Sequence, residues 1–332
     1  MTDAIVVGAG IVGAACAYYL AQEGLTVTVL DAEFAASGTT AAGMGHVVVL
    51  DDDPLSRYSQ HLLGALDPPD VGMDRCGTLW VAETPDLLPA SGGEWLDEQS
   101  LREAEPALRP GLAGALHVPD DFVVYQPALT RWLLAGLTVK EHTRVERLDE
   151  LKADVIVNAT GAWAPTLTPG LRIFPRKGHL VVTDRVPGLC RHQVAELGYV
   201  QSAKTLGDAS VAFNVQPRST GQVLIGSSRE LVGWDASINH DILGRMVRRA
   251  VDFMPGLADV NALRVWTGFR PATADHRPFI GAWSRTPGVW IAAGHEGLGI
   301  TMALGTGRLL TDLIVGRTPA IDPAPYSPSR VA

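Results

Sequence analysis

The chain has 332 residues, of which 46% are hydrophobic and 19% are charged, a composition typical of a compact globular protein rather than a disordered one. A net charge of −9 and a pI near 5.4 argue against nucleic acid or anionic lipid as a partner. Cys16, Cys76 and Cys190 match neither a zinc site nor a dense disulfide framework, so we expect no metal and a reducing, cytoplasmic compartment.

The first thirty residues predict a strand, a tight turn, a helix and a second strand, which together make a βαβ unit. Residues 3–7 form a short apolar strand, and residues 11–23 follow a helical pattern that ends at Gly24. Residues 25–30 (LTVTVL) are apolar or β-branched throughout, as in a parallel strand covered on both faces. Because glycines interrupt the apolar stretch 4–21 and no basic region precedes it, we expect a soluble protein with no membrane span.

The turn between the first strand and helix reads G-A-G-I-V-G, with Gly8, Gly10 and Gly13 at its glycine positions. The first glycine permits the turn, the second lets the backbone approach a pyrophosphate, and the third allows close packing of helix on strand. Asp31 ends the second strand, where a carboxylate accepts ribose hydroxyls and disfavours a 2′-phosphate. Glycines that merely permit a turn would not explain this context, so we predict a dinucleotide site. The motif alone does not separate FAD from NAD.

Later segments alternate between this sheet and a second domain. Residues 154–159 (DVIVNA) predict another parallel strand that runs into a glycine-containing turn. Between residues 172 and 265, the alternating segments HLVVTD, SVAFNV and QVLIGS predict antiparallel strands, and residues 241–254 predict an amphipathic helix. From Gly288, a strand, a glycine-rich turn and a helix over roughly 301–315 predict a return to the first sheet.

Six segments resemble the D-amino-acid oxidase family of FAD-dependent oxidoreductases, over nearly the whole chain. They are VVGAGIVGAACAYYLAQEG from Val6, SGTTAAGMGH from Ser37, NATGAWA from Asn158, PRKGHL from Pro175, TGFRPATADHRPFIG from Thr267 and GVWIAAGHEGLGITMALGTGRLL from Gly288. The GTTAAGMGH and GHEGLGIT segments are most similar to D-hydroxyproline dehydrogenase and opine oxidase-like members, and glycine oxidase belongs to the same family.

The resemblance implies an α/β fold with a Rossmann-type, glutathione-reductase-like FAD-binding domain. This domain is interleaved with an α+β substrate domain built on an antiparallel sheet. We expect the FAD-binding domain at residues 1–75, 124–170 and 266–325, and the substrate-binding domain at residues 76–123 and 171–265.

The resemblance also implies which residues contact FAD. The segment from Ser37 to Gly43 would follow the pyrophosphate and isoalloxazine, Val145 would meet the adenine, and the final glycine-rich turn would meet the flavin ring. The full expected set is Gly8, Gly10, Ile11, Val12, Gly13, Asp31, Ala32, Ser37, Thr39, Thr40, Ala42, Gly43, Met44, Gly45, Val145, Ala159, Thr160, Gly161, Trp163, Gly268, Arg270, Gly294, His295, Glu296, Gly297, Leu298, Gly299, Ile300 and Thr301. Some family members attach flavin to a cysteine near the C-terminus, and none follows Cys190, so we expect non-covalent FAD.

Two residues are candidates for the chemistry. The family uses an arginine at the position of Arg270 to hold a substrate carboxylate by two parallel hydrogen bonds, although a surface salt bridge is the commoner use of an arginine. His46 is a candidate to tune amine protonation or to contact substrate, with a packed, hydrogen-bonded histidine as the equal alternative. Tyr199, Phe213 and Trp234 are weaker candidates for apolar walls over the flavin, and for His179 simple packing is the alternative to a site role.

The sequence therefore predicts an enzyme that oxidises an amino acid or imino acid, such as a D-amino acid, a D-hydroxyproline-like compound or an N-substituted glycine. Hydride would pass from the substrate Cα to flavin N5 and leave an imine that hydrolyses. The alternatives are an oxygen-using glycine or sarcosine oxidase, a flavin-carrying subunit of a heteromeric dehydrogenase, and an NAD-dependent dehydrogenase. Oxygen, a quinone or a partner subunit would take the electrons, and the sequence is compatible with an oligomer.

Overall fold

The computed structural model describes residues 3–49, 53–87, 93–197 and 209–331. The chain divides into two compact units. The first comprises Met1–Val71, Val124–Pro175 and Phe269–Ala332, and the second comprises Gly72–Val123 and Arg176–Gly268. The chain thus crosses between units after residues 71, 123, 175 and 268, whereas we expected domain boundaries after 75, 123, 170 and 265. The assignment of FAD to one unit and substrate to the other stays a prediction.

The first unit contains a six-stranded sheet. Its strands are β1 (Asp3–Val7), β2 (Thr26–Leu30), β8 (Thr138–Lys140), β9 (Val155–Asn158), β15 (Phe279–Ala282) and β16 (Val289–Ala293). They lie in the order β15-β16-β9-β1-β2-β8, with the five strands from β16 to β8 parallel and β15 antiparallel at the edge. The predicted strands at 3–7, 25–30 and 154–159, and the strand predicted after Gly288, are all present within a residue or two. Strands β8 and β15 were not predicted.

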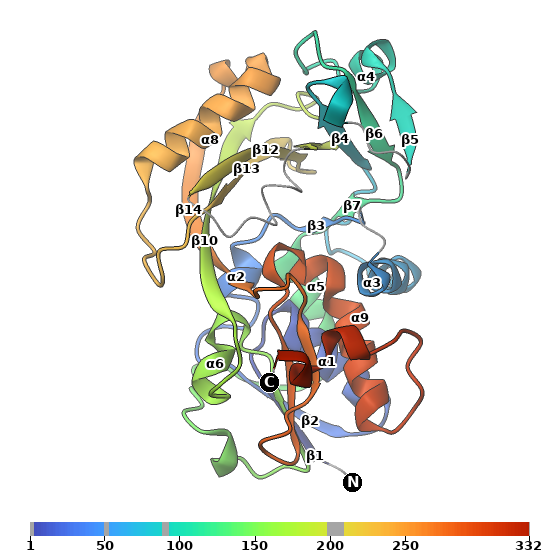
Figure 1. Ribbon diagram of the computed structural model, residues 1–332, viewed down its shortest axis with the longest axis vertical. Coiled ribbons are helices and arrows are strands. Elements are labelled where there is room, and N and C mark those ends of the chain that lie inside the picture. The colour runs from blue at the N-terminus through green and yellow to red at the C-terminus, as the bar shows by residue number, and fades with distance from the viewer. Residues whose placement is uncertain (1–2, 50–52, 88–92, 198–208, 332) are drawn as a thin grey trace. The chain divides into compact units, whose positions relative to one another are not determined.

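Helices accompany this sheet, together with the short strand β3 (His46–Val47). They are α1 (Ile11–Gln22), α2 (Gly38–Ala41), α3 (Pro54–Leu66), α5 (Gln126–Leu133), α6 (Ala164–Leu167) and α9 (Gly299–Ile314), with 3-10 turns η2 (Leu148–Glu150), η3 (Gly161–Trp163), η5 (Glu296–Leu298), η6 (Ala324–Tyr326) and η7 (Pro328–Val331). Helices α1 and α9 pack directly on each other (Figure 1). Gly307 permits this approach, because a Cβ there would lie 2.5 Å from the Ala15 carbonyl oxygen.

The second unit is built on an eight-stranded sheet. Its strands are β4 (Thr78–Ala82), β5 (Glu94–Leu96), β6 (Gly114–Val118), β10 (Phe174–Arg185), β11 (Gln193–Glu196), β12 (Ser210–Pro217), β13 (Gln222–Arg229) and β14 (Ala262–Ala272), accompanied by β7 (Phe122–Val123), α4 (Glu98–Ala104), α8 (His240–Phe253), η1 (Pro85–Leu87) and η4 (Pro255–Asp259). The sheet order is β14-β10-β13-β12-β11-β4-β6-β5. Residues 174–175 of β10 and 269–272 of β14 belong to the first unit. Its described registers are antiparallel except between β4 and β11, which run parallel. The segments HLVVTD, SVAFNV and QVLIGS lie on β10, β12 and β13, which pair antiparallel as expected, and the parallel pair of β4 and β11 was not predicted.

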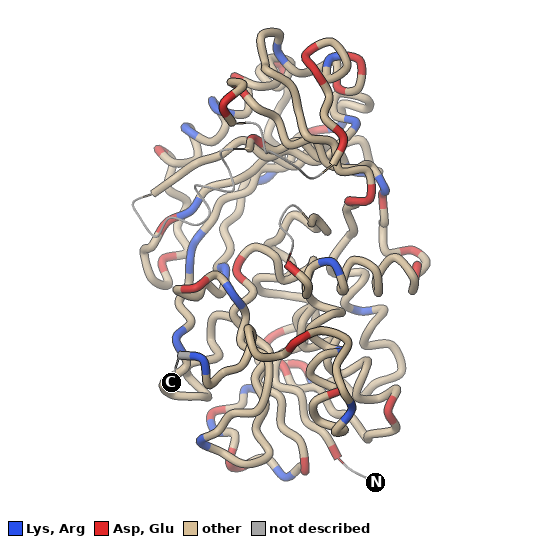
Figure 2. The backbone as a smooth tube through the Cα atoms, turned by 45° about the vertical axis from the view of Figure 1, so that its right-hand side comes forward, with Lys and Arg blue, Asp and Glu red and all other residues tan. Residues whose placement is uncertain are grey.

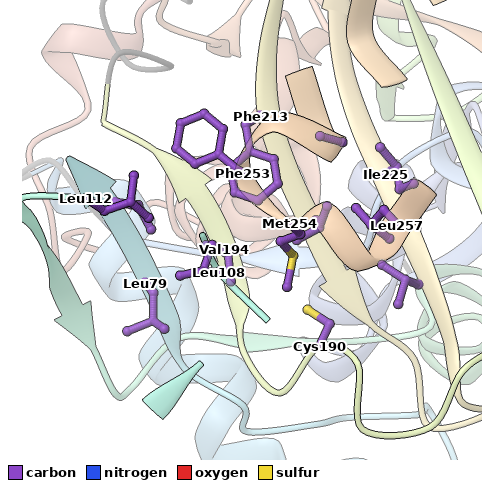
Figure 3. Packing of buried hydrophobic residues seen from close by; sticks show 14 of the residues in the cluster. Leu79, Leu108, Leu112, Cys190, Val194, Phe213, Ile225, Phe253, Met254 and Leu257 are labelled. Carbon is purple, nitrogen blue, oxygen red and sulfur yellow. The ribbon is translucent and has the colours of Figure 1, made fainter. Parts of the chain in front are cut away.

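Helix α8 covers this sheet with one apolar face, from which Met246, Ala250 and Phe253 are buried. The Phe253 ring stacks on the Phe213 ring, with centroids 4.4 Å apart and planes 4° from parallel (Figure 3). Phe213 is fully buried in this core, so its interpretation as an apolar wall over a flavin is wrong. Trp234 is 47% exposed, and Tyr199 lies outside the described residues.

Charged residues of both signs are scattered along the backbone of both units (Figure 2). No helix within the described ranges is both long and apolar enough to cross a bilayer. Across the same residues, no group of three or more His, Cys, Asp or Glu side chains is arranged to hold a metal ion.

Candidate functional site

The glycine-rich turn after β1 is shaped by contacts that leave no room for side chains. Gly8 has a φ of +108°, and a Cβ there would lie 2.6 Å from the carbonyl oxygen of Ala159. A Cβ at Gly13 would overlap the carbonyl oxygen of Gly8, and one at Gly10 would lie 3.0 Å from Thr40 Oγ1. The turn therefore presents bare backbone at the N-terminus of α1, as a bound pyrophosphate requires.

Asp31 ties this turn to the end of β2. Its Oδ2 accepts a 2.7 Å hydrogen bond from the Ala9 N–H, and its Oδ1 accepts a 2.9 Å bond from the Glu33 N–H. A carboxylate has about four acceptor positions, so two remain for ribose hydroxyls beside Ala32. Asp31 thus shapes the glycine turn as well as offering the acceptor that we expected.

The GTTAAGMG segment lies against the same turn. Thr40 is buried, and its Oγ1 accepts a 3.0 Å hydrogen bond from the Ile11 N–H, the first residue of α1. Thr39 Oγ1 donates to the Phe269 carbonyl oxygen at 2.7 Å. Helix α2 has no side-chain cap at Ser37. The segment therefore joins the glycine turn to β14, although the two are more than 200 residues apart.

Two buried amides that we did not predict hold the backbone of this region. Gln126 Nε2 donates to the Gly43 carbonyl oxygen at 2.8 Å. Asn158 Oδ1 accepts hydrogen bonds from the N–H and the hydroxyl of Thr160, at 3.2 and 2.7 Å. Its Nδ2 donates to the Ala164 carbonyl oxygen at 3.0 Å. The only sequence signal for either was its position, at the start of a helix and at the end of a strand.

Asn158 thereby shapes the turn that carries four expected FAD contacts, Ala159, Thr160, Gly161 and Trp163. Ala159 packs against Gly8, and Gly161 adopts a φ of +59°. Trp163 follows in η3 and is 41% exposed, which is high for a tryptophan. The turn thus stands beside the glycine turn with an accessible aromatic surface.

The turn before α9 offers a helix N-terminus. Gly294 has a φ of +90°, η5 follows, and α9 begins at Gly299 with no side-chain cap from Leu298. Uncapped N–H groups at a helix start favour an electron-rich group such as the pyrimidine edge of a flavin. Ile300 lies next to Gly43, where a Cβ would be 3.2 Å from its Cδ1. The glycine-rich segments from opposite ends of the chain therefore meet.

His295 contributes to this turn from the interior. Its ring is buried, and its Nε2 lies 2.9 Å from Thr306 Oγ1 on α9. Burial lowers the pKa of His295 to about 3, so the imidazole is neutral at physiological pH. The ring is engaged with α9, which leaves the backbone of His295 as the part available to a cofactor.

The two candidates for the chemistry meet at Gly297. His46 Nε2 lies 3.1 Å from the Gly297 carbonyl oxygen, and a Cβ at Gly297 would be 3.7 Å from Arg270 Nε. The Thr301 hydroxyl donates to the His46 carbonyl oxygen at 3.2 Å and so holds β3 against α9. His46 is therefore hydrogen-bonded, as its packing alternative requires, and it also lies within the expected site.

The other residues that we expected to contact FAD lie on several different elements. Val12 is on α1 and Ala42 ends α2, while Met44 is buried and the Gly45 carbonyl oxygen accepts from the Val124 N–H at 2.8 Å. Val145 packs against the hydrophobic cluster along β9 and β16. Gly268 is the last residue of the second unit, on β14. Adenine contact by Val145 and cofactor contact by Gly268 stay predictions.

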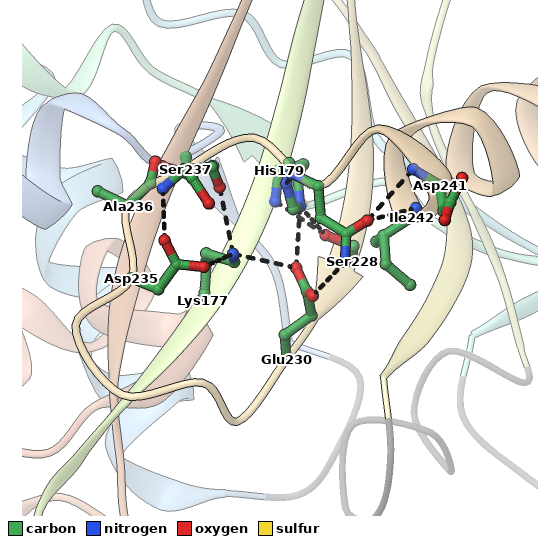
Figure 4. Close-up of polar contacts among 11 residues, drawn as sticks. Lys177, His179, Ser228, Glu230, Asp235, Ala236, Ser237, Asp241 and Ile242 are labelled. Atoms are coloured by element: carbon green, nitrogen blue, oxygen red, sulfur yellow. Dashed lines mark hydrogen bonds and ion pairs between the residues drawn. The ribbon is translucent and has the colours of Figure 1, made fainter.

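His179 belongs to a buried polar network in the second unit (Figure 4). Its Nε2 accepts from the Asn239 N–H at 3.0 Å, and its Nδ1 lies 2.9 Å from Ser228 Oγ. Nearby, Lys177 Nζ lies 3.1 Å from Asp235 Oδ2, and hydrogen bonds from Ser237 and then Lys177 lower the pKa of Asp235 to about 2. The PRKGHL segment thus anchors the loop that leads into α8, and His179 packs rather than standing open to a ligand.

Comparison with known proteins decides which cofactor the site takes. Residues 3–313 match the DAO family, described as FAD dependent oxidoreductase. The chain belongs to this family. The DAO match extends over both units, so FAD is the cofactor and the alternative of an NAD-dependent dehydrogenase is excluded.

Individual relatives agree with this membership. The glycine oxidase of Pseudomonas aeruginosa is 28% identical over 375 residues, which cover 98% of each chain. The bifunctional protein ThiO/ThiG of Synechocystis sp. is 29% identical over 368 residues. That alignment covers 99% of this chain but 54% of the relative, so the chain spans about half the length of the bifunctional protein. The crystal structure of glycine oxidase from Geobacillus kaustophilus matches with a TM-score of 0.86 at 25% identity, over 99% of both chains.

The residues present fit FAD. The side-chain-free turn at Gly8, Gly10 and Gly13 suits the pyrophosphate, and the spare acceptor positions of Asp31 suit the ribose. The uncapped start of α9 suits the electron-rich edge of the flavin. All three features lie within the first unit.

Proposed function

We propose that this chain oxidises an amino acid or imino acid at the bond between Cα and nitrogen. The observation that carries the proposal is the meeting of Arg270 and His46 at Gly297, in the turn that leads into α9. A cation and an imidazole beside a flavin-binding turn suit a substrate that bears a carboxylate and an amine. The names of the glycine oxidase relatives support the same substrate class.

Arg270 would bind the substrate carboxylate. A guanidinium holds a carboxylate by two parallel hydrogen bonds, which set the orientation of the substrate as well as its affinity. Arg270 is on β14, and the hydrogen bond from Thr39 to the preceding carbonyl fixes the backbone at this point. The arginine is therefore placed on a rigid strand and not on a free loop.

His46 would hold a proton near the substrate amine. An amino acid arrives mainly as an ammonium ion, which must lose a proton before its Cα–H bond is broken as a hydride. An imidazole is the side chain best suited to take that proton near neutral pH, and His46 would take it at Nδ1, because its Nε2–H donates to the Gly297 carbonyl oxygen. When bound, FAD supplies the two-electron acceptor. Water then hydrolyses the released imine.

The substrates that we consider share an α-carboxylate, a neighbouring nitrogen and a hydrogen on Cα. D-amino acids, D-hydroxyproline-like imino acids and N-substituted glycines all meet these requirements. The name glycine oxidase favours oxygen as the electron acceptor, with a quinone or a partner subunit as the alternative. Hydrogen peroxide formed in equal amount to the imine, with no added acceptor, would select oxygen. Turnover that requires an artificial acceptor would select the alternative.

The proposal is tested at Arg270. Arg270→Ala should lower kcat/KM for an amino acid about 100-fold, because a charge-assisted pair contributes about 3 kcal/mol, and FAD content should be unchanged. An amine of the same skeleton without the carboxylate should lose less than threefold. Arg285→Ala removes an exposed arginine of the same unit and serves as the control. An equal loss for both substrates would contradict the role of Arg270.

A further inference from the structure

Two residues outside the proposed chemistry face each other across two turns of the first unit. Nδ1 of His276, after β14, lies 2.9 Å from Oε2 of Glu296, before α9. Their side chains are 26% and 14% exposed, so the contact is partly shielded from water. Both residues adopt a left-handed backbone, with φ of +58° and +48°. Few residues with a side chain do so, and such a conformation persists where the surroundings hold it.

The turn that carries His276 is fixed from its other side. Arg330 Nε and Nη2 donate to the two carboxylate oxygens of Asp275, at 2.7 and 3.1 Å. The Arg330 guanidinium also lies over the Phe279 ring, 4.0 Å from its centroid. Thr273 Oγ1 closes the turn by donating to the Arg277 carbonyl oxygen at 3.0 Å. His276 therefore projects from a rigid base.

The turn that carries Glu296 leads directly to the proposed site. The next residue is Gly297. Its carbonyl oxygen is hydrogen-bonded to His46, and its Cα lies beside the Arg270 side chain. The same turn touches the base of the His276 turn at a second point, since a Cβ at Gly294 would be 2.8 Å from Thr273 Cγ2. Two contacts thus join these turns, and the one made by His276 is adjacent to Gly297.

We propose that His276 and Glu296 are positioning residues that fix the Glu296–Gly297 backbone relative to β14. In this way they set how Arg270 and His46 are presented to the substrate. Neither side chain touches the substrate, and the effect passes through Gly297. The expected effect on turnover rests on the proposed function. The expected effect on the flavin spectrum requires only that FAD binds beside this turn.

The test uses two variants. One preserves the backbone preference of His276, and the other preserves the size of Glu296. His276→Asn suits a left-handed φ but is too short to reach Glu296, and Glu296→Gln keeps the size but removes the charge. His276→Asn should lower kcat/KM for the amino acid about tenfold, and Glu296→Gln should lower it by less, because a glutamine oxygen can still accept from Nδ1 of His276. The double variant should lose no more than His276→Asn alone, because that change already removes the contact. The unfolding midpoint should stay near that of the parent, and each variant should still bind FAD, so that its flavin spectrum can be recorded.

A spectroscopic measurement separates positioning from a purely structural role. The visible absorption bands of bound FAD should shift in the same direction in both single variants, since the turn at the start of α9 moves in each. His117→Asn removes a histidine from another His–Glu pair, with Glu94 at 3.5 Å in the second unit, and should change neither spectrum nor turnover. Parent-like flavin spectra in both variants would overturn the inference. Losses that multiply in the double variant would do the same. If the parent oxidises no amino acid, the proposed function fails, and the spectra still decide on the pair.

Discussion

The hydroxyl of Thr39 donates a 2.7 Å hydrogen bond to the carbonyl oxygen of Phe269, the residue before Arg270. This bond connects α2, at the start of the chain, to β14, near its end, and both residues belong to the first unit. The segment expected to follow the FAD pyrophosphate thus also supports the backbone of the residue expected to bind substrate. A substitution at Thr39 should therefore change the position of the Arg270 backbone.

Thr39→Val should therefore impair catalysis more than FAD binding. The substitution keeps the shape of the side chain and removes one hydrogen bond, a loss of about 1 kcal/mol that corresponds to about a fivefold drop in kcat/KM. Thr39→Ser retains the hydroxyl and should stay near the parent value. Steady-state kinetics with an amino acid, alongside FAD titration, makes the comparison. Equal kinetics for the Val and Ser variants would refute the coupling.

Gly10→Val should abolish FAD retention. Even a Cβ at Gly10 would lie 3.0 Å from Thr40 Oγ1, and the added methyl groups would enter the space that the pyrophosphate needs. Gly64→Val places the same side chain on α3 at a glycine with no atom within 4 Å, and should retain FAD. The ratio of flavin to protein absorbance after gel filtration reports the result. A Gly10→Val protein with full FAD content would contradict the glycine turn as the pyrophosphate site.

Lys177→Met should destabilise the second unit strongly. Lys177 is 1% exposed and its Nζ is 3.6 Å from Glu230 Oε2, so the substitution leaves a buried carboxylate without its cation. Breaking such a pair costs about 3–5 kcal/mol. Adding Glu230→Gln should recover part of the loss, and Lys140→Met, at an exposed lysine, should have little effect. Urea denaturation of the three variants tests this, and a Lys177→Met protein as stable as the parent would refute it.

His295 should make the protein less stable in mild acid. Its pKa is about 3 in the folded chain and about 6.5 when unfolded, so the unfolded state binds a proton first as pH falls. The neutral ring therefore costs no stability above pH 6.5. Below pH 6.5 the free energy of unfolding decreases, and at pH 5 it is lower by about 2 kcal/mol. His295→Gln should remove this term and leave a hydrogen-bonding group near Thr306.

Urea denaturation at pH 7.5 and pH 5 measures the His295 effect. The difference in unfolding free energy between the two pH values should be about 2 kcal/mol smaller for His295→Gln than for the parent. His117→Asn, at a histidine that is partly open to water, should keep the parent difference. The same pH dependence in parent and His295→Gln would show that the buried ring is not the cause.

Local patterns in the sequence predicted the elements that build the glycine turn after β1. The strand at residues 3–7 and the helix start at Ile11 were both predicted, because apolar periodicity and the glycines mark them. Strand β8 was missed, since its three residues are too few to show a period. The parallel pairing of β4 with β11 was also missed, because register between distant segments leaves no local pattern.

The same distinction separates the predicted and missed parts of the site. Gly8 and Asp31 were identifiable as candidates because the roles expected of them follow from position in one βαβ unit. Gln126 and His276 act through contacts with residues far along the chain, which no spacing rule reveals. Likewise, the motif placed His295 at the turn, but the direction of its ring depends on how α9 packs.

The most direct test of the account is anaerobic titration of the purified chain with amino acids while the flavin absorbance is recorded. We predict a yellow protein with one FAD per chain, released by acid, that is bleached by at least one carboxylate-bearing amino or imino acid. D-amino acids, L-amino acids, N-methyl glycine and cyclic imino acids form the panel, and the corresponding amines without a carboxylate should react poorly. A protein that takes up no FAD, or whose bound flavin no member of the panel reduces, would contradict it.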